Sequence, residues 1–201
     1  PEAPYVWTYG HRNPQGLTVT KDGTVWLNEH GPQGGDELNR IERGNNYGWP
    51  AICYCLDYTN AYVTPFTEWA GMEQPAHYWR PSIAPSGLAI YEGDRFPEWQ
   101  GDFFTGALVN KDVSRLHQTA DGKLEEEKLF GEVGERVRDV RSGPDGALYF
   151  TVEGPNGRIM RAVSDAPYSV SEPVSEAASA PDEASESTDE PEAASTEPVS
   201  D

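Results

Sequence analysis

Short stretches in which apolar and polar residues alternate run through the first 163 residues, and a glycine-containing turn follows most of them. Examples are GLTVT, TVWLNE, GLAIY and ALYFTVE. Successive side chains of a β-strand point to opposite faces, so this alternation predicts short, half-buried strands. Gly, Pro, Trp, Tyr, Asn and Asp are frequent and long runs of Ala, Leu, Glu and Lys are missing, which favours an all-β protein.

The expected strands fall into three copies of one pattern. Each copy has an alternating apolar run, an Asp-Gly or Gly-Asp turn before an aromatic strand, and an outer strand that ends near Arg. The copies begin GLTVTKDGTVWLNEHG, GLAIYEGDRFPEWQGDFFTGAL and VRDVRSGPDGALYFTVEG, and continue with DELNRIERG, KDVSRLHQTADGKL and NGRIMRAV. Asp22-Gly23, Asp121-Gly122 and Asp145-Gly146 predict hairpins, because Asp-Gly tolerates the positive φ angles of a type I′ turn. Each copy therefore forms three or four short strands.

Repeated small antiparallel sheets are typical of β-propeller blades. Each blade buries its faces against its neighbours, so three blades leave two open ends and cannot close a ring. We therefore expect about three further blades N-terminal to Pro1. The alternative is a compact β-sandwich made from the same strands. Between the first and second copies, residues 52–85 form an insertion rich in aromatic residues and proline, and long ordered loops of this kind are usually functional.

The last part of the chain has a different composition. Residues 168–201 contain no Lys, Arg, Trp, Phe, Leu or Ile, and they are rich in Glu, Ser, Ala and Pro. Such a segment cannot bury enough apolar surface to offset its ordering entropy. We expect a folded domain over residues 1–166 and a disordered acidic tail over residues 167–201, which could serve as a solubilising extension, a spacer or a cell-surface stalk.

Charge and hydropathy exclude several classes of partner. The tail holds ten carboxylates, and without them the formal net charge of −19 becomes −9. A negative body argues against nucleic acid as a partner. No apolar stretch approaches the roughly 20 residues that span a bilayer, and no signal peptide is visible at the start. The chain begins with Pro1 close to a polar motif, so we expect it to be truncated or processed upstream.

Cys53 and Cys55 are the two cysteines of the chain. One intervening residue in an extended segment would place both side chains on the same face. Two cysteines are too few for a metal site. A local disulfide is the alternative to two reduced thiols, and the sequence favours the reduced thiols.

Two polar clusters belong to the first copy. In GHRNPQG, Arg12 and Asn13 precede Pro14, which holds Asn13 extended, and a cation beside an amide suits an anionic ligand with carbonyl groups. A capped turn before a strand is the alternative interpretation. In NEHGPQGGDELNRIERGNNYGWP, Glu29, Asp36 and Glu37 lie in a glycine-rich loop whose backbone carbonyls can turn inward. This oxygen-rich environment suits Ca²⁺ better than Zn²⁺.

A third cluster lies in GERVRDVRSGPDG. Arg136 and Arg138 are two residues apart in an expected strand, so they project from the same face and could hold carboxylates or phosphates. The alternative is surface pairing with Glu132, Glu135 or Asp139. Lys111, in GALVNKDVSR, is a lone cation. Taken together, cations, amides and hard oxygen ligands suit a small cofactor with several carboxylates.

The ordered motifs HRNPQG, EHGPQGGDELN, GNNYGWP, APSGLAIY with FFTGAL, and RVRDVRSGPDGALY make the chain resemble the soluble aldose and glucose dehydrogenases that depend on pyrroloquinoline quinone (PQQ). The resemblance covers roughly residues 5–163 and would make the chain the C-terminal half of a six-bladed propeller. It implies oxidation of an aldose sugar at C1 to the lactone, with PQQ and Ca²⁺ as cofactors. It also implies an artificial or respiratory electron acceptor and a periplasmic or secreted location.

The resemblance gives roles to individual residues. Arg12 and Asn13 resemble the pair that contacts PQQ, Tyr58 a cofactor- or substrate-contacting tyrosine, and Arg136 and Arg138 the pair that binds the PQQ carboxylates. Gly31 and Pro32 resemble the residues whose carbonyls bind the Ca²⁺ that holds PQQ. Glu37 and Tyr47 resemble ligands of a structural Ca²⁺, with Tyr47 acting through its main chain.

The chain departs from the family in two places. A lysine that contacts the cofactor commonly follows Gly-Ala-Leu, but Val109 stands there and Lys111 comes two residues later. The family's general base is a histidine of an earlier blade, and none of the four histidines (His11, His30, His77, His117) matches its motif. We therefore expect a sugar dehydrogenase whose isolated C-terminal fragment is inactive. A non-catalytic propeller that binds sugar or protein, or a calcium-stabilised scaffold, is the alternative.

Overall fold

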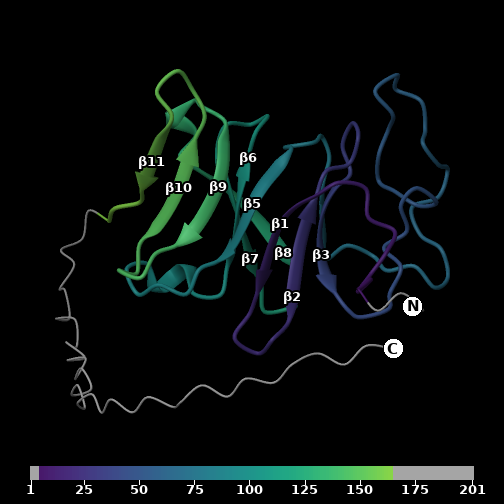
Figure 1. Ribbon diagram of the computed structural model, residues 1–201, viewed down its shortest axis with the longest axis horizontal. Coiled ribbons are helices and arrows are strands. Elements are labelled where there is room, and N and C mark those ends of the chain that lie inside the picture. The colour runs from purple at the N-terminus through teal and green to yellow at the C-terminus, as the bar shows by residue number, and fades with distance from the viewer. Residues whose placement is uncertain (1–4, 165–201) are drawn as a thin grey trace, which may run out of the picture. The chain divides into compact units, whose positions relative to one another are not determined.

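The computed structural model describes residues 5–164 (Figure 1). The acidic tail expected at residues 167–201 lies outside this range. The described residues form three antiparallel sheets and two short 3₁₀ turns. The first sheet has the order β1-β2-β3-β4, the second β5-β6-β7-β8, and the third β9-β10-β11.

Each sheet corresponds to one copy of the sequence pattern. The first contains β1 (Pro14–Val19), β2 (Val25–Glu29), β3 (Asp36–Ile41) and β4 (His77–Trp79). The second contains β5 (Pro85–Ile90), β6 (Phe103–Ala107), β7 (Val113–Gln118) and β8 (Leu124–Leu129), with a 3₁₀ turn at Pro97–Trp99. The third contains β9 (Val137–Ser142), β10 (Leu148–Val152) and β11 (Arg158–Arg161), preceded by a 3₁₀ turn at Gly131–Val133. Only β4 was not expected, because it comes from the end of the insertion.

The middle sheet is covered on both faces, which distinguishes propeller blades from a two-layer sandwich. One apolar cluster joins the first and second sheets, and its members include Leu38, Trp79, Leu88 and Phe103. A second cluster joins the second and third sheets, and its members include Tyr91, Phe104, Val140 and Phe150. The first strands of the sheets are neighbours, since β1 contacts β5 and β5 contacts β9 (Figure 1). The all-β, blade-like fold expected from the sequence is therefore confirmed.

The three Asp-Gly hairpins form where the sequence predicts them, but the predicted turn type is wrong. Gly23, Gly122 and Gly146 have left-handed φ angles of 86°, 84° and 74°. The preceding aspartates are not among the residues with positive φ, whereas a type I′ turn needs two such residues. In each turn the Gly amide donates to the carbonyl three residues earlier, as Gly23 does to Thr20 at 2.9 Å. This is the hairpin in which a left-handed glycine follows a type I turn.

A buried amide fastens the first two sheets near their inner strands. Asn28, which is fully buried, donates from Nδ2 to Ser86 O at 3.0 Å and to Thr105 Oγ1 at 2.7 Å. Its Oδ1 accepts from the Gly16 amide at 2.6 Å. Ser86 Oγ in turn donates to Val137 O of the third sheet at 2.7 Å. Polar side chains of β2 and β5 thus link all three sheets.

Gly16 marks the point of closest approach between β1 and β5. A Cβ atom at Gly16 would lie 2.5 Å from Leu88 N and 2.7 Å from Ser86 O, and neither backbone atom can move independently. We expect Gly16→Ala to lower the free energy of unfolding by about 1–3 kcal/mol, because the added methyl group overpacks the junction. Urea denaturation measures the effect. Gly131→Ala is the control, since its Cβ meets nothing within 4 Å and the change should be nearly neutral; equal effects of the two variants would contradict the prediction.

No helix among residues 5–164 has the length and apolar character needed to cross a membrane.

Candidate cofactor and metal site

The carboxylate of Glu29, at the end of β2, organises the segment that carries Arg12 and Asn13. It accepts from the Arg12 amide at 2.6 Å and from the Asn13 amide at 3.4 Å, both at Oε2. Its other oxygen, Oε1, contacts His11 Nδ1 at 2.8 Å. Because Glu29 is buried, these bonds fix the backbone just before β1. The backbone positions of Arg12 and Asn13 are therefore fixed by Glu29.

A second carboxylate, Asp36, fastens the glycine-rich loop to the crossover between the first two sheets. Its Oδ1 accepts from the Gly31 amide at 2.9 Å. Its Oδ2 accepts from Ser82 Oγ at 2.7 Å and from the Ile83 and Ala84 amides, each at 2.9 Å. Because these four donors already occupy its oxygens, Asp36 holds the two loops together and is not available as a metal ligand.

Glu37 is the third of the carboxylates noted in the sequence, and it has the fewest hydrogen-bond donors of the three. One donor contacts it, Asn39 Nδ2 at 3.1 Å, and the same amide also contacts Glu29 at 3.2 Å. Burial raises the pKa of Glu37 to about 7, and the negative charges of Glu29 and Asp36 add to this rise. A carboxylate in this setting has the capacity to accept a cation.

Glu37 faces an enclosed cavity of about 10 Å³, which has room for one water-sized sphere. Its lining is Gly10, Arg12, Glu29, His30, Gly31, Gly35, Glu37, Tyr47, Trp49, Ile52, Cys53 and Cys55. The Tyr47 hydroxyl is already engaged, because it donates to Arg40 O at 2.6 Å and accepts from the Glu42 amide at 2.8 Å. Any contribution of Tyr47 to a cation would therefore come from its main chain.

The donor set of this cavity fits a hard cation. Residues 5–164 hold no cluster of three or more His, Cys, Asp or Glu side chains that could bind a metal, so most ligands would be main-chain oxygens. The Asn39 Oδ1 atom, on the residue that bridges Glu37 and Glu29, is buried without a hydrogen-bond partner in the described chain. One carboxylate combined with neutral oxygens is the chemistry of Ca²⁺ sites.

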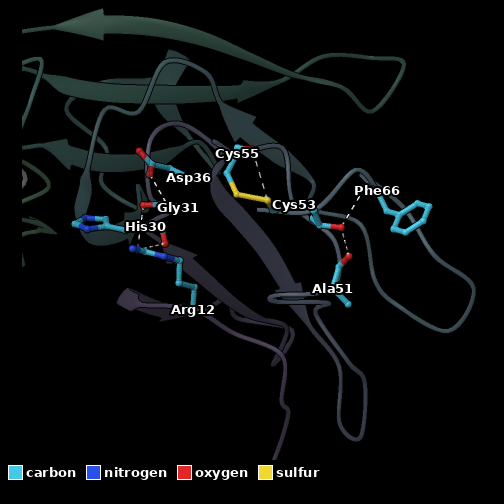
Figure 2. The surroundings of a disulfide bond; sticks show 9 residues. Arg12, His30, Gly31, Asp36, Ala51, Cys53, Cys55 and Phe66 are labelled. Atoms are coloured by element: carbon cyan, nitrogen blue, oxygen red, sulfur yellow. Dashed lines mark hydrogen bonds between the residues drawn. A yellow bond between two sulfur atoms is a disulfide. The ribbon is translucent and has the colours of Figure 1, made fainter. Parts of the chain in front are cut away.

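Arg12 lies between this cavity and an open cleft. Its Nη1 donates to His30 O at 3.1 Å and Gly31 O at 3.0 Å, as Figure 2 shows. The guanidinium lies 5.4 Å from the ring centroid of Trp49. Arg12, Pro32 and Tyr58 also line the cleft, which has a volume of about 380 Å³. The structure thus brings Arg12, Gly31, Pro32 and Tyr58 together.

Asn13 lies beside a second depression of about 290 Å³ between the inner strands. Its Oδ1 accepts from Gln15 Nε2 at 3.0 Å, and Gln15 lines this depression together with Arg138 and Ser86. Gln15 of the first sheet and Arg138 of the third sheet therefore line one depression, with Ser86 of β5 between them in the chain order of the sheets.

Arg138 lies on β9 and Arg136 directly before that strand, and the two side chains share one partner. Both guanidinium groups reach Glu153 Oε2, Arg136 from 3.8 Å and Arg138 in direct contact. Each arginine side chain is about half exposed. The carboxylate that they share was not among the three partners considered from the sequence, because Glu153 lies 15 residues beyond Arg138 and only the β9–β10 pairing brings it near.

Lys111 stands apart from these groups. It is exposed in the turn between β6 and β7, where its φ angle is 62°. It lines neither the cleft around Arg12 nor the depression around Arg138.

Sequence reasoning missed Trp49. It lines both the enclosed cavity and the cleft, and it stacks with Arg12. The available signal was its place in GNNYGWP, two residues after Tyr47, although nothing in the spacing connects it to Arg12.

The expectation of two reduced thiols is wrong, because Cys53 and Cys55 form a disulfide (Figure 2). In a fully extended segment, residues i and i+2 lie about 6.6 Å apart, near the upper limit for a disulfide. Here the chain bends, and the Cα–Cα distance is 5.2 Å, within the usual range. No residue pattern around the two cysteines predicts this bend.

Comparisons with known proteins agree with this fold. The chain is 42% identical over 160 residues to the aldose sugar dehydrogenase YliI of Escherichia coli, covering 78% of this chain and 43% of that protein. A crystal structure of a glucose dehydrogenase matches with a TM-score of 0.76 and 46% identity, over 81% of this chain and 48% of that one. The PQQ-bound aldose sugar dehydrogenase of Streptomyces coelicolor matches with a TM-score of 0.59 and 25% identity, over 80% of this chain and 47% of that one.

The three sheets are blades of a β-propeller, as in these relatives. Residues 1–161 match the family described as Glucose / Sorbosone dehydrogenase. The chain belongs to that family, and it spans less than half the length of the relatives described above.

Proposed function

We propose that this chain supplies cofactor- and calcium-binding residues of a sugar dehydrogenase that uses PQQ and Ca²⁺ to oxidise an aldose at C1 to the lactone. The observation that carries the proposal is the way Glu29 holds Arg12 and Asn13 beside the cavity of Glu37. The similarity to a PQQ-bound aldose sugar dehydrogenase supports the choice of cofactor.

One calcium ion would bind in the enclosed cavity. Glu37 would supply its carboxylate and Tyr47 its main chain, while Asp36 and Glu29 hold the surrounding loops. The carbonyls of Gly31 and Pro32 would bind the calcium that holds PQQ. Gly31 O already accepts from Arg12, but a carbonyl oxygen has two lone pairs and can accept a second partner.

The cofactor would lie over the cleft and the depression described above. When bound, PQQ supplies a quinone that takes up the hydride, and calcium polarises it as a Lewis acid. Arg12 uses one nitrogen for the carbonyls of His30 and Gly31, so its other N–H groups remain for ligand oxygens. Asn13 would donate its side-chain amide to the cofactor, and Tyr58 would cover the cleft. Lys111 would contact the cofactor from the turn between β6 and β7, outside the cleft and the depression.

Arg136 and Arg138 would bind the cofactor carboxylates. They form a double fork suited to carboxylate, and Glu153 now occupies it. Their exposure leaves them accessible to a ligand that displaces Glu153 or adds to it.

The general base would lie in the part of the protein that the relatives have and this chain does not span. The four histidines here have other contacts. His11 contacts Glu29, His30 Nε2 lies 2.6 Å from Pro85 O, and His117 contacts Asp102 at 2.9 Å. His77 packs edge-on against Trp79, and burial lowers its pKa. The chain by itself would therefore not oxidise sugar.

An oxidising location, periplasmic or secreted, is part of the proposal. The disulfide supports it, because such bonds persist mainly outside the reducing cytosol.

Reconstitution tests the proposal. This chain, alone and fused to the N-terminal part of E. coli YliI, is mixed with PQQ and Ca²⁺, and glucose-dependent reduction of a dye acceptor is followed. We expect activity only in the fusion, and at least tenfold less in a fusion carrying Arg136→Gln and Arg138→Gln, because neutral amides lose the charge-assisted bonds. A fusion that folds but binds no PQQ would reject the dehydrogenase and leave a binding or scaffold propeller.

A further inference from the structure

The Cys53–Cys55 disulfide lies in the wall of the enclosed cavity. Both residues line the cavity, and they are only 7% and 3% exposed. The bond closes a loop with a sequence separation of two, and the stabilisation that a disulfide gains by restricting the unfolded chain is smallest for short loops. Its main effect must therefore be local, on the shape of the wall that contains it.

The segment around the disulfide is joined to the glycine-rich loop. The Gln33 amide donates to Leu56 O at 3.0 Å, and the Leu56 amide donates to Gln33 O at 3.3 Å. A Cβ atom at Gly35 would lie 2.9 Å from Cys55 Cβ, so the two segments are in close contact. The disulfide thus supports the loop that carries Gly31 and Pro32.

The other side of the segment is also fixed. The Cys53 amide donates to Phe66 O at 3.1 Å, which ties the disulfide to a later part of the same insertion. The disulfide is therefore held between the remainder of the insertion and the loop that carries Gly31 and Pro32.

We propose that Cys53 and Cys55 are positioning residues for the cation cavity, and that the oxidation state of their bond is coupled to cation binding. This inference rests on the proposed calcium site at Glu37. A dithiol reduces the bond by breaking S–S, forming two thiols and becoming a cyclic disulfide itself, so two electrons and two protons pass to the protein. The freed sulfurs must then separate to van der Waals distance, and a wall around a space of about 10 Å³ cannot absorb this without moving.

Coupling of this kind is reciprocal. If reduction weakens cation binding by some factor, a bound cation makes the disulfide harder to reduce by the same factor. Couplings of about 5- to 150-fold are typical, and we expect about tenfold here.

Terbium luminescence tests the first half of the coupling in the 201-residue chain. Tb³⁺ is a hard cation that Ca²⁺ displaces, and Tyr47 and Trp49 in the cavity lining can sensitise its emission. We expect the oxidised chain to bind Tb³⁺ about tenfold more tightly than the dithiol-reduced chain. The double variant Cys53→Ser and Cys55→Ser should bind like the reduced chain and should not respond to the dithiol.

A redox titration with and without Ca²⁺ tests the second half. The dithiol-to-disulfide ratio at which half of Cys53–Cys55 is reduced should rise about tenfold when Ca²⁺ is present, a shift that a merely structural disulfide would not show. Equal Tb³⁺ affinity in the two redox states, or a midpoint that ignores Ca²⁺, overturns the inference and leaves the calcium site intact. Absence of Tb³⁺ and Ca²⁺ binding in the oxidised chain overturns both.

Discussion

Replacing Asp36 with alanine is expected to lower the free energy of unfolding by about 3–5 kcal/mol. The Asp36 side chain is fully buried, and its loss leaves the amides of Gly31 and Ile83 without an acceptor, while the Ala84 amide keeps Ser82 Oγ at 3.1 Å. Each buried donor that loses its partner costs about 1–3 kcal/mol. Urea denaturation followed by tryptophan fluorescence measures the change.

Glu42→Ala is the matched control for Asp36. Glu42 is an exposed carboxylate near the same strand, paired with Arg40 at 3.8 Å, and such surface pairs contribute about 0–1 kcal/mol. If Asp36→Ala were as mild as Glu42→Ala, the crossover at residues 82–84 would not depend on this carboxylate.

The second large effect is expected from Glu37→Gln, which should weaken Ca²⁺ binding at least about 100-fold, since ligand charge strongly sets calcium affinity. The change keeps the shape of the side chain and the bond with Asn39, but it removes the negative charge. Isothermal titration calorimetry with Ca²⁺ on the apo chain measures the affinity.

A stability measurement and a control variant separate loss of calcium binding from damage to the fold in Glu37→Gln. The apo variant should be at least as stable as the parent, because a buried carboxylate with a raised pKa is replaced by a neutral amide. Glu73→Gln is the control, as Glu73 is exposed and bonds only Asn45 among the side chains described. Unchanged calcium affinity in Glu37→Gln would place the cation elsewhere.

The fold could be predicted from the sequence because its signals are local. Alternation such as GLTVT and the three Asp-Gly pairs depend on neighbouring residues, and strands and hairpins form where they indicate. The turn type could not be predicted in this way, because Asp22, Asp121 and Asp145 tolerate a positive φ angle but do not adopt one in this fold. Strand β4 was hidden because His77–Trp79 is short and lies inside the insertion.

The site was only partly predictable, because its connections are long-range. Sequence reasoning identified Glu29, Asp36 and Glu37 as one oxygen-rich group, but not their separate tasks. Glu29 and Asp36 accept hydrogen bonds from backbone amides that lie 5 to 48 residues away, whereas the one donor to Glu37 is the side chain of Asn39. The shared carboxylate Glu153 and the bend at Cys53–Cys55 depend on tertiary structure in the same way.

The third sheet has a consequence for assembly. It has three strands within the described chain, where each of the other two sheets has four, and β11 lies at one edge. An edge strand presents a row of amide and carbonyl groups that templates the addition of another strand, and Ile159 on β11 is 75% exposed. Strands of other molecules can pair with an uncovered edge of this kind, so we expect self-association of the chain to increase with its concentration.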